Sequence, residues 1–105
     1  MPNGRDARAL KRIRNEILVG LKVVYPAALQ VERLLRSLLV LFPTLELDQL
    51  KRDLHYLSEK GYVERVIADS ENGNGLTPWR RRWFRLTTHG VEIAERCIAD
   101  PALED

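Results

Sequence analysis

Four arginines and two tryptophans crowd into residues 79–85, and this group is the strongest chemical signal in the sequence. Three consecutive arginines on a strand point to both of its faces and cannot all be buried without charged partners. At least one or two of them should therefore meet solvent, where a guanidinium can contact the phosphates of a nucleic acid. The group consists of Trp79, Arg80, Arg81, Arg82, Trp83 and Arg85, and we expect the phosphate contacts from Arg80, Arg81 and Arg82.

Two alternatives compete with phosphate binding in this segment. The arginines can pair with Glu64, Asp69 and Glu71 across a hairpin, because opposite charges on neighbouring strands attract each other. Tryptophan side chains more often pack within a protein than stack on a ligand, so we expect Trp79 and Trp83 to be packing residues. An exposed Trp83 would instead indicate a protein interface.

The residues that could support catalysis do not form a catalytic pattern. His55 and His89 have no cysteine, aspartate or second histidine at metal-ligand spacing, so we expect neither a metal site nor a cofactor. The only cysteine, Cys97, cannot form an internal disulfide, which is typical of a reducing compartment. The sequence therefore predicts a protein that is not an enzyme.

Length and composition predict one folded unit. The chain has 105 residues, of which 45% are hydrophobic and 30% are charged, as in an ordinary globular protein. We expect a single domain over residues 1–105, with an ordered core of about residues 6–99 and an acidic tail of residues 100–105. The longest apolar run, residues 38–42, is too short to cross a membrane, and the first residues resemble no secretory signal. The predicted location is the cytoplasm, with no membrane partner.

Apolar residues at helical spacing predict three consecutive helices. They cover residues 6–24, residues 30–41, and the segment from about residue 46 to Gly61. Pro43 ends the second helix because its ring disfavours helical geometry in the preceding residue, and Gly61 suits the left-handed end of the third. The expected inward residues are Leu10, Ile13, Ile17, Leu21 and Val24, then Val31, Leu34, Leu35 and Leu38, then Leu47, Leu50, Leu54 and Leu57.

The helical spacing of the apolar residues ends at Gly61. Residues 62–68 and 80–86 suit two strands of a hairpin, joined by a glycine-rich loop over residues 69–78. Thr87 or Thr88 can cap a last helix, which ends at the Asp-Pro pair of residues 100 and 101. The inward residues expected in that helix are Val91, Ala94, Cys97 and Ile98.

This order of elements is that of a winged helix-turn-helix domain, an α+β fold that is mostly α-helical. The run Leu50-Lys-Arg-Asp-Leu-His-Tyr-Leu-Ser-Glu-Lys-Gly-Tyr-Val63 and the run Trp83-Phe-Arg-Leu-Thr-Thr-His-Gly90 resemble the winged-helix signature of bacterial regulators. In that signature a leucine-spaced helix ends in a lysine-glycine pair, and a strand ends in Arg-Leu-Thr before the last helix. The resemblance spans roughly residues 17–97 and is greatest to the small single-domain winged-helix proteins of Mu-like phages and prophages.

The resemblance implies that the third helix enters the major groove of double-stranded DNA while the hairpin contacts phosphates. Glutamine can pair with adenine and arginine with guanine through two hydrogen bonds each, so Gln49 and Arg52 are the expected base readers. Asp48 and Glu59 lie on the same strip and would repel phosphates, and the alternative is a solvated helix of mixed charge. The DNA contacts expected from this helix are Gln49, Lys51, Arg52 and Tyr56.

Two functions remain for such a chain, whose net charge is only +2. The first is a DNA-binding transcriptional regulator of phage or bacterial type. The second is an adaptor whose hairpin and first helix bind another protein without binding DNA. The first helix is longer than a small core requires, so we also expect a homodimer formed through the first and last helices.

Overall fold

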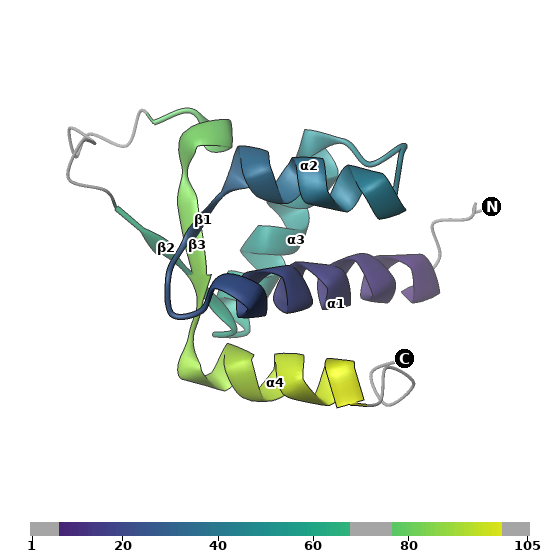
Figure 1. The fold of residues 1–105 in the computed structure, drawn as a ribbon. Helices are drawn as coiled ribbons and strands as arrows, with labels where there is room; N and C mark the ends of the chain where they lie inside the picture. Colours follow the sequence, from purple (N-terminus) through teal and green to yellow (C-terminus); the bar gives the residue numbers. More distant parts are fainter. Residues whose placement is uncertain (1–6, 68–76, 100–105) are drawn as a thin grey trace.

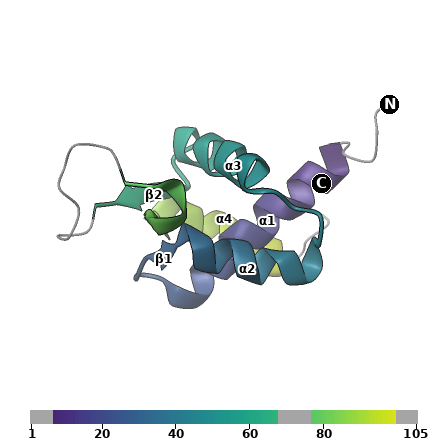
Figure 2. The same ribbon diagram turned by 90° about the horizontal axis from the view of Figure 1, so that it is seen from above.

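Four α-helices and a small antiparallel sheet form the part of the chain that the computed structural model describes, residues 7–67 and 77–99. Figure 1 shows α1 and α4 side by side and antiparallel, with α2 on the other side of α1 and the strands at one end of the helices. Seen from above, α2 and α3 flank the line of α1 (Figure 2). The elements are α1 (Ala7–Val24), β1 (Leu29–Gln30), α2 (Val31–Leu41), α3 (Leu47–Glu59), β2 (Val63–Val66), the 3₁₀ turn η1 (Trp79–Arg81), β3 (Trp83–Leu86) and α4 (Thr88–Ala99).

The sheet has the strand order β1-β3-β2, and both pairings are antiparallel. Phe84 pairs with Leu29 on one side and with Arg65 on the other, so β3 is the central strand. Phe84 and Leu86 are buried, whereas Arg85 between them is exposed. This alternation is typical of a strand with one face against a core, and it directs one face of the sheet toward the helices.

An apolar core lies where the leucine stripes of the helices and the inner face of the sheet meet. The four residues predicted to face inward from α2 are all buried, and in α3 the predicted stripe is buried from Leu50 onward. Within the described residues, no helix combines the length and the apolarity needed to cross a membrane. The core consists of Ile17, Leu18, Leu21, Val31, Leu34, Leu35, Leu38, Leu50, Leu54, Leu57, Val63, Phe84, Leu86, Ile93, Ala94 and Cys97.

A hydrogen-bonded junction joins the end of α3 to the start of α4. Gly61 has the positive φ of 80° predicted for the end of α3, and the amides of Gly61 and Tyr62 donate to the carbonyls of Ser58 and Leu57. The Thr87 hydroxyl donates to the Gly61 carbonyl at 2.6 Å and accepts the amide of Gly90 at 3.0 Å. Thr87 is therefore the residue that caps α4, and it also holds the end of α3.

Several sequence expectations need correction. The second strand of the hairpin begins at Trp83 rather than at residue 80, because residues 79–81 form a 3₁₀ turn. The first strand is Val63–Val66 and is shorter than predicted. The strand β1 was not predicted, and Ile98 is exposed although an inward position was expected. The loop tip over residues 69–76 and the acidic tail over residues 100–105 lie outside the described residues.

Candidate nucleic-acid interface

The outer face of α3 carries Asp48, Arg52, His55 and Glu59, all of which are exposed. Helical geometry explains this set, because residues three or four positions apart share one side of a helix. Arg52 makes only a long contact of 3.5 Å from its Nε to the Asp48 carbonyl on the same helix. Of the four DNA contacts predicted on α3, Arg52 and Tyr56 are exposed, whereas Gln49 and Lys51 are partly buried.

Gln49, the other expected base reader, faces α1 instead of solvent. Its Nε2 donates to Oδ2 of Asp53 at 3.1 Å, one helical turn further along α3. Tyr56 lies on the same side of the helix, where the Arg14 guanidinium stands 3.8 Å from the centre of its ring. Both side chains are therefore engaged with groups that the sequence analysis did not connect to them.

Asp53 is buried, and its partner comes from α1. Arg14 Nε lies 3.1 Å from Asp53 Oδ1, with the aspartate side chain 0% exposed and the arginine side chain 27% exposed. A carboxylate taken out of water needs a paired charge and further hydrogen bonds, and Arg14 and Gln49 supply them.

The burial of Asp53 changes the charge that α3 presents to solvent. The segment from Glu46 to Lys60 carries four acidic residues, and the charge of one of them, Asp53, is balanced by Arg14 inside the protein. Three acidic residues then stand against three basic ones, so the outward charge is balanced rather than negative. These residues are Glu46, Asp48, Glu59, Lys51, Arg52 and Lys60.

Lys51 faces the hairpin formed by residues 63–86, which we call the wing. Its Nζ lies 5.8 Å from the centre of the Trp79 ring, and the Arg82 guanidinium lies 4.5 Å from the same ring. Trp79 also stacks on Phe84, with ring centroids 6.0 Å apart and an interplanar angle of 11°. Trp79 is therefore a packing residue that connects α3 with the wing. The half-buried Arg82 also donates from its Nε to the Thr77 carbonyl at 3.0 Å.

Arg80 and Arg81 are exposed, and hydrogen bonds to the helix-turn-helix hold the segment that carries them. The first amide of α2, from Val31, donates to the Arg82 carbonyl at 2.9 Å. Gln30 Nε2 donates to the Arg81 carbonyl at 3.3 Å. The guanidinium groups of Arg80 and Arg81 thus belong to a turn whose backbone is held by two hydrogen bonds from the start of α2.

Pairing across the hairpin, the competing explanation for the arginines, holds for Arg85. Its Nε lies 2.6 Å from Glu64 Oε2 on the neighbouring strand. The other two acidic partners considered, Asp69 and Glu71, lie outside the described residues. Arg85 is therefore a member of a surface ion pair, while Arg80 and Arg81 stay candidates for phosphate contact.

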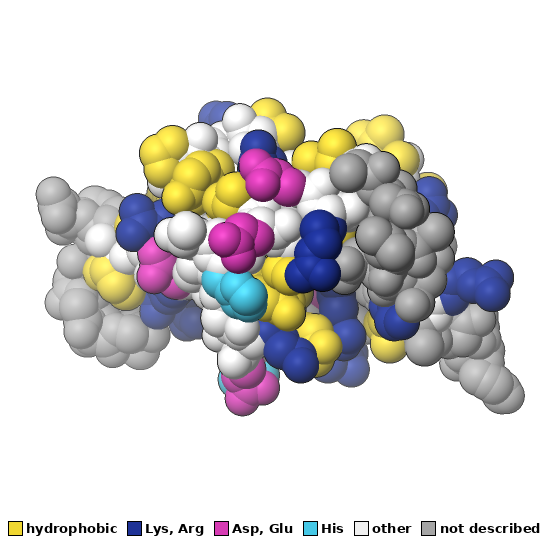
Figure 3. All heavy atoms as spheres, turned by 90° about the horizontal axis from the view of Figure 1, so that it is seen from below, with side chains coloured by type: hydrophobic (Ala, Val, Ile, Leu, Met, Phe, Trp, Pro, Cys, Tyr) yellow, Lys and Arg dark blue, Asp and Glu magenta, His cyan; other side chains and the backbone are white. Residues whose placement is uncertain are grey.

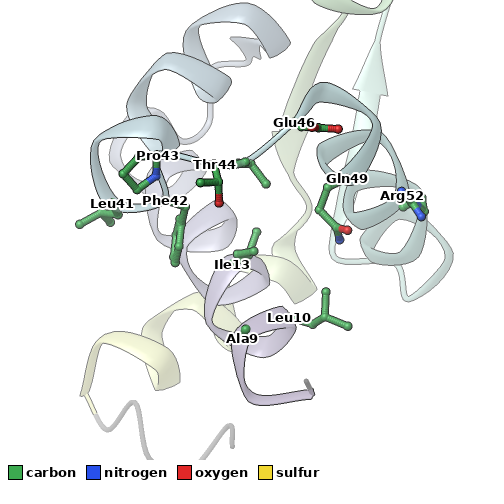
Figure 4. Close-up of a pocket in the computed structure, with 11 residues that line it drawn as sticks. Ala9, Leu10, Ile13, Leu41, Phe42, Pro43, Thr44, Glu46, Gln49 and Arg52 are labelled. Atoms are coloured by element: carbon green, nitrogen blue, oxygen red, sulfur yellow. The ribbon is translucent and has the colours of Figure 1, made fainter. Parts of the chain in front are cut away.

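A pocket of about 470 Å³ separates the N-terminal half of α1 from α3. Leu10 and Ile13 of α1 form one wall, Gln49 and Arg52 of α3 form another, and residues 41–46 of the α2–α3 turn close it (Figure 4). The side of α3 that carries Gln49 and Arg52 consequently borders an open space, while Leu50 on its other side is packed in the core.

The sequence analysis missed the Arg14–Asp53–Gln49 group, although a signal for it exists. Asp53 falls within the stripe of Leu50, Leu54 and Leu57, so a carboxylate at this position must enter the core. An acid on a buried stripe requires a cation on a facing element, and this requirement leads to Arg14.

The arrangement of elements matches that of a known winged-helix protein. It is similar to the crystal structure of wild-type MarR from E. coli in its apo form, with a TM-score of 0.55 and 24% sequence identity over 94% of this chain and 76% of that chain. No family model matches the sequence. A search of curated proteins finds no significant match. The likeness confirms the predicted winged helix-turn-helix fold, while the nearer resemblance to phage proteins stays a prediction.

Proposed function

We propose that the chain is a single-domain, cytoplasmic, non-enzymatic DNA-binding regulator of phage or bacterial type. In this proposal α3 lies in the major groove and the wing contacts phosphates. The main support is the exposure of Arg52 on the outer face of α3, together with the exposure of Arg80 and Arg81 on the anchored turn of the wing. The winged helix-turn-helix fold is of the kind that DNA-binding regulators use.

The proposed contacts divide into reading and positioning roles. Arg52 reads a base edge, because a guanidinium on the exposed face of a groove-bound helix can donate two hydrogen bonds to guanine. Arg80 and Arg81 bind phosphates, with Lys51 and Tyr56 at the edge of the same surface. Gln49 and Arg82 were expected to touch DNA directly, and we now assign them supporting roles because Asp53 and Trp79 engage them.

A DNA titration at several salt concentrations separates these roles. Replacing Arg80 and Arg81 together by alanine should weaken binding to all sequences about equally and flatten the salt slope by up to roughly two units. Arg52→Ala should instead cost about 1–3 kcal/mol on the preferred site and little on random DNA. Arg96→Ala is the matched control, since Arg96 is an exposed arginine on α4, which lies across α1 from α2 (Figure 1).

Two results would count against the regulator. A parent protein that binds no DNA at low salt would favour the adaptor, in which the same surface meets a protein. A loss for Arg96→Ala of about half that of the wing variant, which removes two charges rather than one, would mean that only net charge matters. The half-buried Trp79 and Trp83 offer the adaptor no exposed aromatic patch, which is why DNA is the first choice.

We propose in addition that two copies associate through α1 and α4. Exposed apolar side chains exist on both helices, with Val23 79% and Ile98 56% exposed. Seen from below, hydrophobic side chains gather near one edge of the molecule and charges of both signs occupy its centre (Figure 3). Such a mixed surface can pair with its own copy across a two-fold axis. Sedimentation should show a dimer that Val23→Glu weakens, and monomer alone at high micromolar concentration would remove this proposal.

A further inference from the structure

We infer that Arg14 of α1 is a positioning residue for the DNA-reading face of α3, and that it acts through Asp53 and Gln49. This inference rests on the proposed function. Asp53 is the charged residue among the buried residues that the structure describes, and it lies on a stripe of α3 that otherwise consists of leucines. A buried carboxylate is strongly attracted to the one guanidinium that reaches it, so the bond fixes where α3 stands relative to α1.

The pocket leaves the α1-facing side of the first turns of α3 without apolar packing, so the polar bond supplements the packing of Leu50, Leu54 and Leu57 in fixing the position of α3. Leu10 and Ile13 of α1 do not close against Gln49 and Arg52, because the space of about 470 Å³ lies between them (Figure 4). Well-packed side chains resist displacement, whereas a helix beside an open space can shift or turn at low cost. The bond from Arg14 to Asp53 spans the two helices next to this space and limits that movement.

Arg52 stands next to Asp53 in the chain, and both belong to one rigid helix. Any rotation of α3 about its axis that loosens Asp53 from Arg14 therefore also changes the direction of the Arg52 side chain. Two-hydrogen-bond recognition of a base tolerates little misplacement, whereas a phosphate contact tolerates more. Loss of the bond should thus reduce sequence selectivity and leave general affinity for DNA nearly unchanged.

The test compares the affinities for a preferred site and for random DNA, with the site selected from a random oligonucleotide pool by the parent protein. Arg14→Met should lower the ratio of these affinities roughly tenfold without changing the salt slope. In an Arg52→Ala background the same change should have no further effect on the ratio. Arg14→Lys, which keeps the charge, should recover part of the selectivity, and Glu32→Gln, which removes an exposed ion pair of 2.7 Å with Arg36, should leave it unchanged.

Circular dichroism at the assay temperature shows how much of each variant is folded. A merely structural role would lower the affinities for both DNAs by the same factor, because only the folded fraction would fall, and that result would overturn the inference. An unchanged ratio in folded Arg14→Met would overturn it as well. Asp53→Asn is a harsher second variant. If it does not fold, Arg14→Met decides the matter, because Asp53 then keeps the hydrogen bond from Gln49.

Hydrogen exchange on the free protein separates this inference from the proposed function. Arg14→Met should speed the exchange of α3 amides while those of α2 keep the rates of the parent. If the parent shows no sequence preference, the proposed function fails, and faster α3 exchange would still support the tie between α1 and α3. Unchanged exchange rates in α3 would overturn the inference that Arg14 holds α3 to α1, even if the parent binds DNA selectively.

Discussion

Leu54→Asp should unfold the protein at room temperature. Leu54 is fully buried in the middle of α3, among Leu50 and Leu57, and no cation faces it in the contacts of the described residues. Burying an unpaired carboxylate there costs several kcal/mol, out of a total stability of about 5–15 kcal/mol for a small domain. Circular dichroism should show the loss of most helical signal, and urea titration should show no cooperative transition.

The neighbouring residue provides the control for this variant. His55 is exposed, and its Nε2 lies 3.4 Å from Glu59 Oε2 on the same helix, so His55→Asp should shift the unfolding midpoint slightly. A cooperative melting curve for Leu54→Asp close to that of His55→Asp would contradict the orientation of α3. It would also remove the basis for placing Arg52 on the outer face.

Among substitutions that replace one hydrogen by a methyl group, Gly90→Ala should reduce the stability of the protein most. A Cβ at this position would overlap the carbonyl oxygen of Tyr62 and lie 2.9 Å from its carbonyl carbon. Backbone atoms cannot turn aside as a flexible side chain can, so the start of α4 must move away from the end of α3. We expect a loss of about 1–3 kcal/mol or more, measured as a lower urea midpoint with the slope of a single transition.

Gly20→Ala is the matched substitution with the opposite sign. Gly20 lies inside α1, and an added Cβ would meet Leu34 Cδ1 at 3.6 Å, which is an ordinary contact. Alanine in a helix interior is favoured over glycine by about 0.5–1 kcal/mol, so this variant should be more stable than the parent. Equal effects of the two substitutions would show that α4 does not approach Tyr62 as closely as described.

The sequence could predict the helices because their information is local and repeated. The stripe of Val31, Leu34, Leu35 and Leu38 covers about two turns, and one misread residue would not hide its period. Gly61 could be predicted as a helix end because few residue types accept its φ of 80°. The strand β1 has only two residues, too few for any period, and exists because β3 lies beside it.

The candidate site was predictable where it depends on exposure alone. Arg52, Arg80 and Arg81 are exposed as expected, because Arg52 lies off the leucine stripe of α3 and consecutive arginines cannot all be buried without charged partners. The inward direction of Gln49 was not predictable in the same way, because it depends on the pairing of Asp53 with Arg14, 39 residues earlier in the chain. The spacing in α3 marks Asp53 as a buried acid, but it does not identify which of the distant cations pairs with it.

The junction around Thr87 makes the segment of the wing between β2 and η1 a replaceable part, whereas Val63, Phe84 and Leu86 of the wing belong to the core. The chain leaves α3 at Gly61, and 26 positions later the Thr87 hydroxyl donates to the Gly61 carbonyl. This hydrogen bond joins the two ends of the segment between them. Lengthening a loop between fixed ends adds only about 0.6 kcal/mol for each doubling of its length. Segments of other lengths and charges can therefore be exchanged between β2 and η1 while the helices keep their places. Related proteins can therefore change the strength of their binding to a polyanion by altering this one segment of the chain.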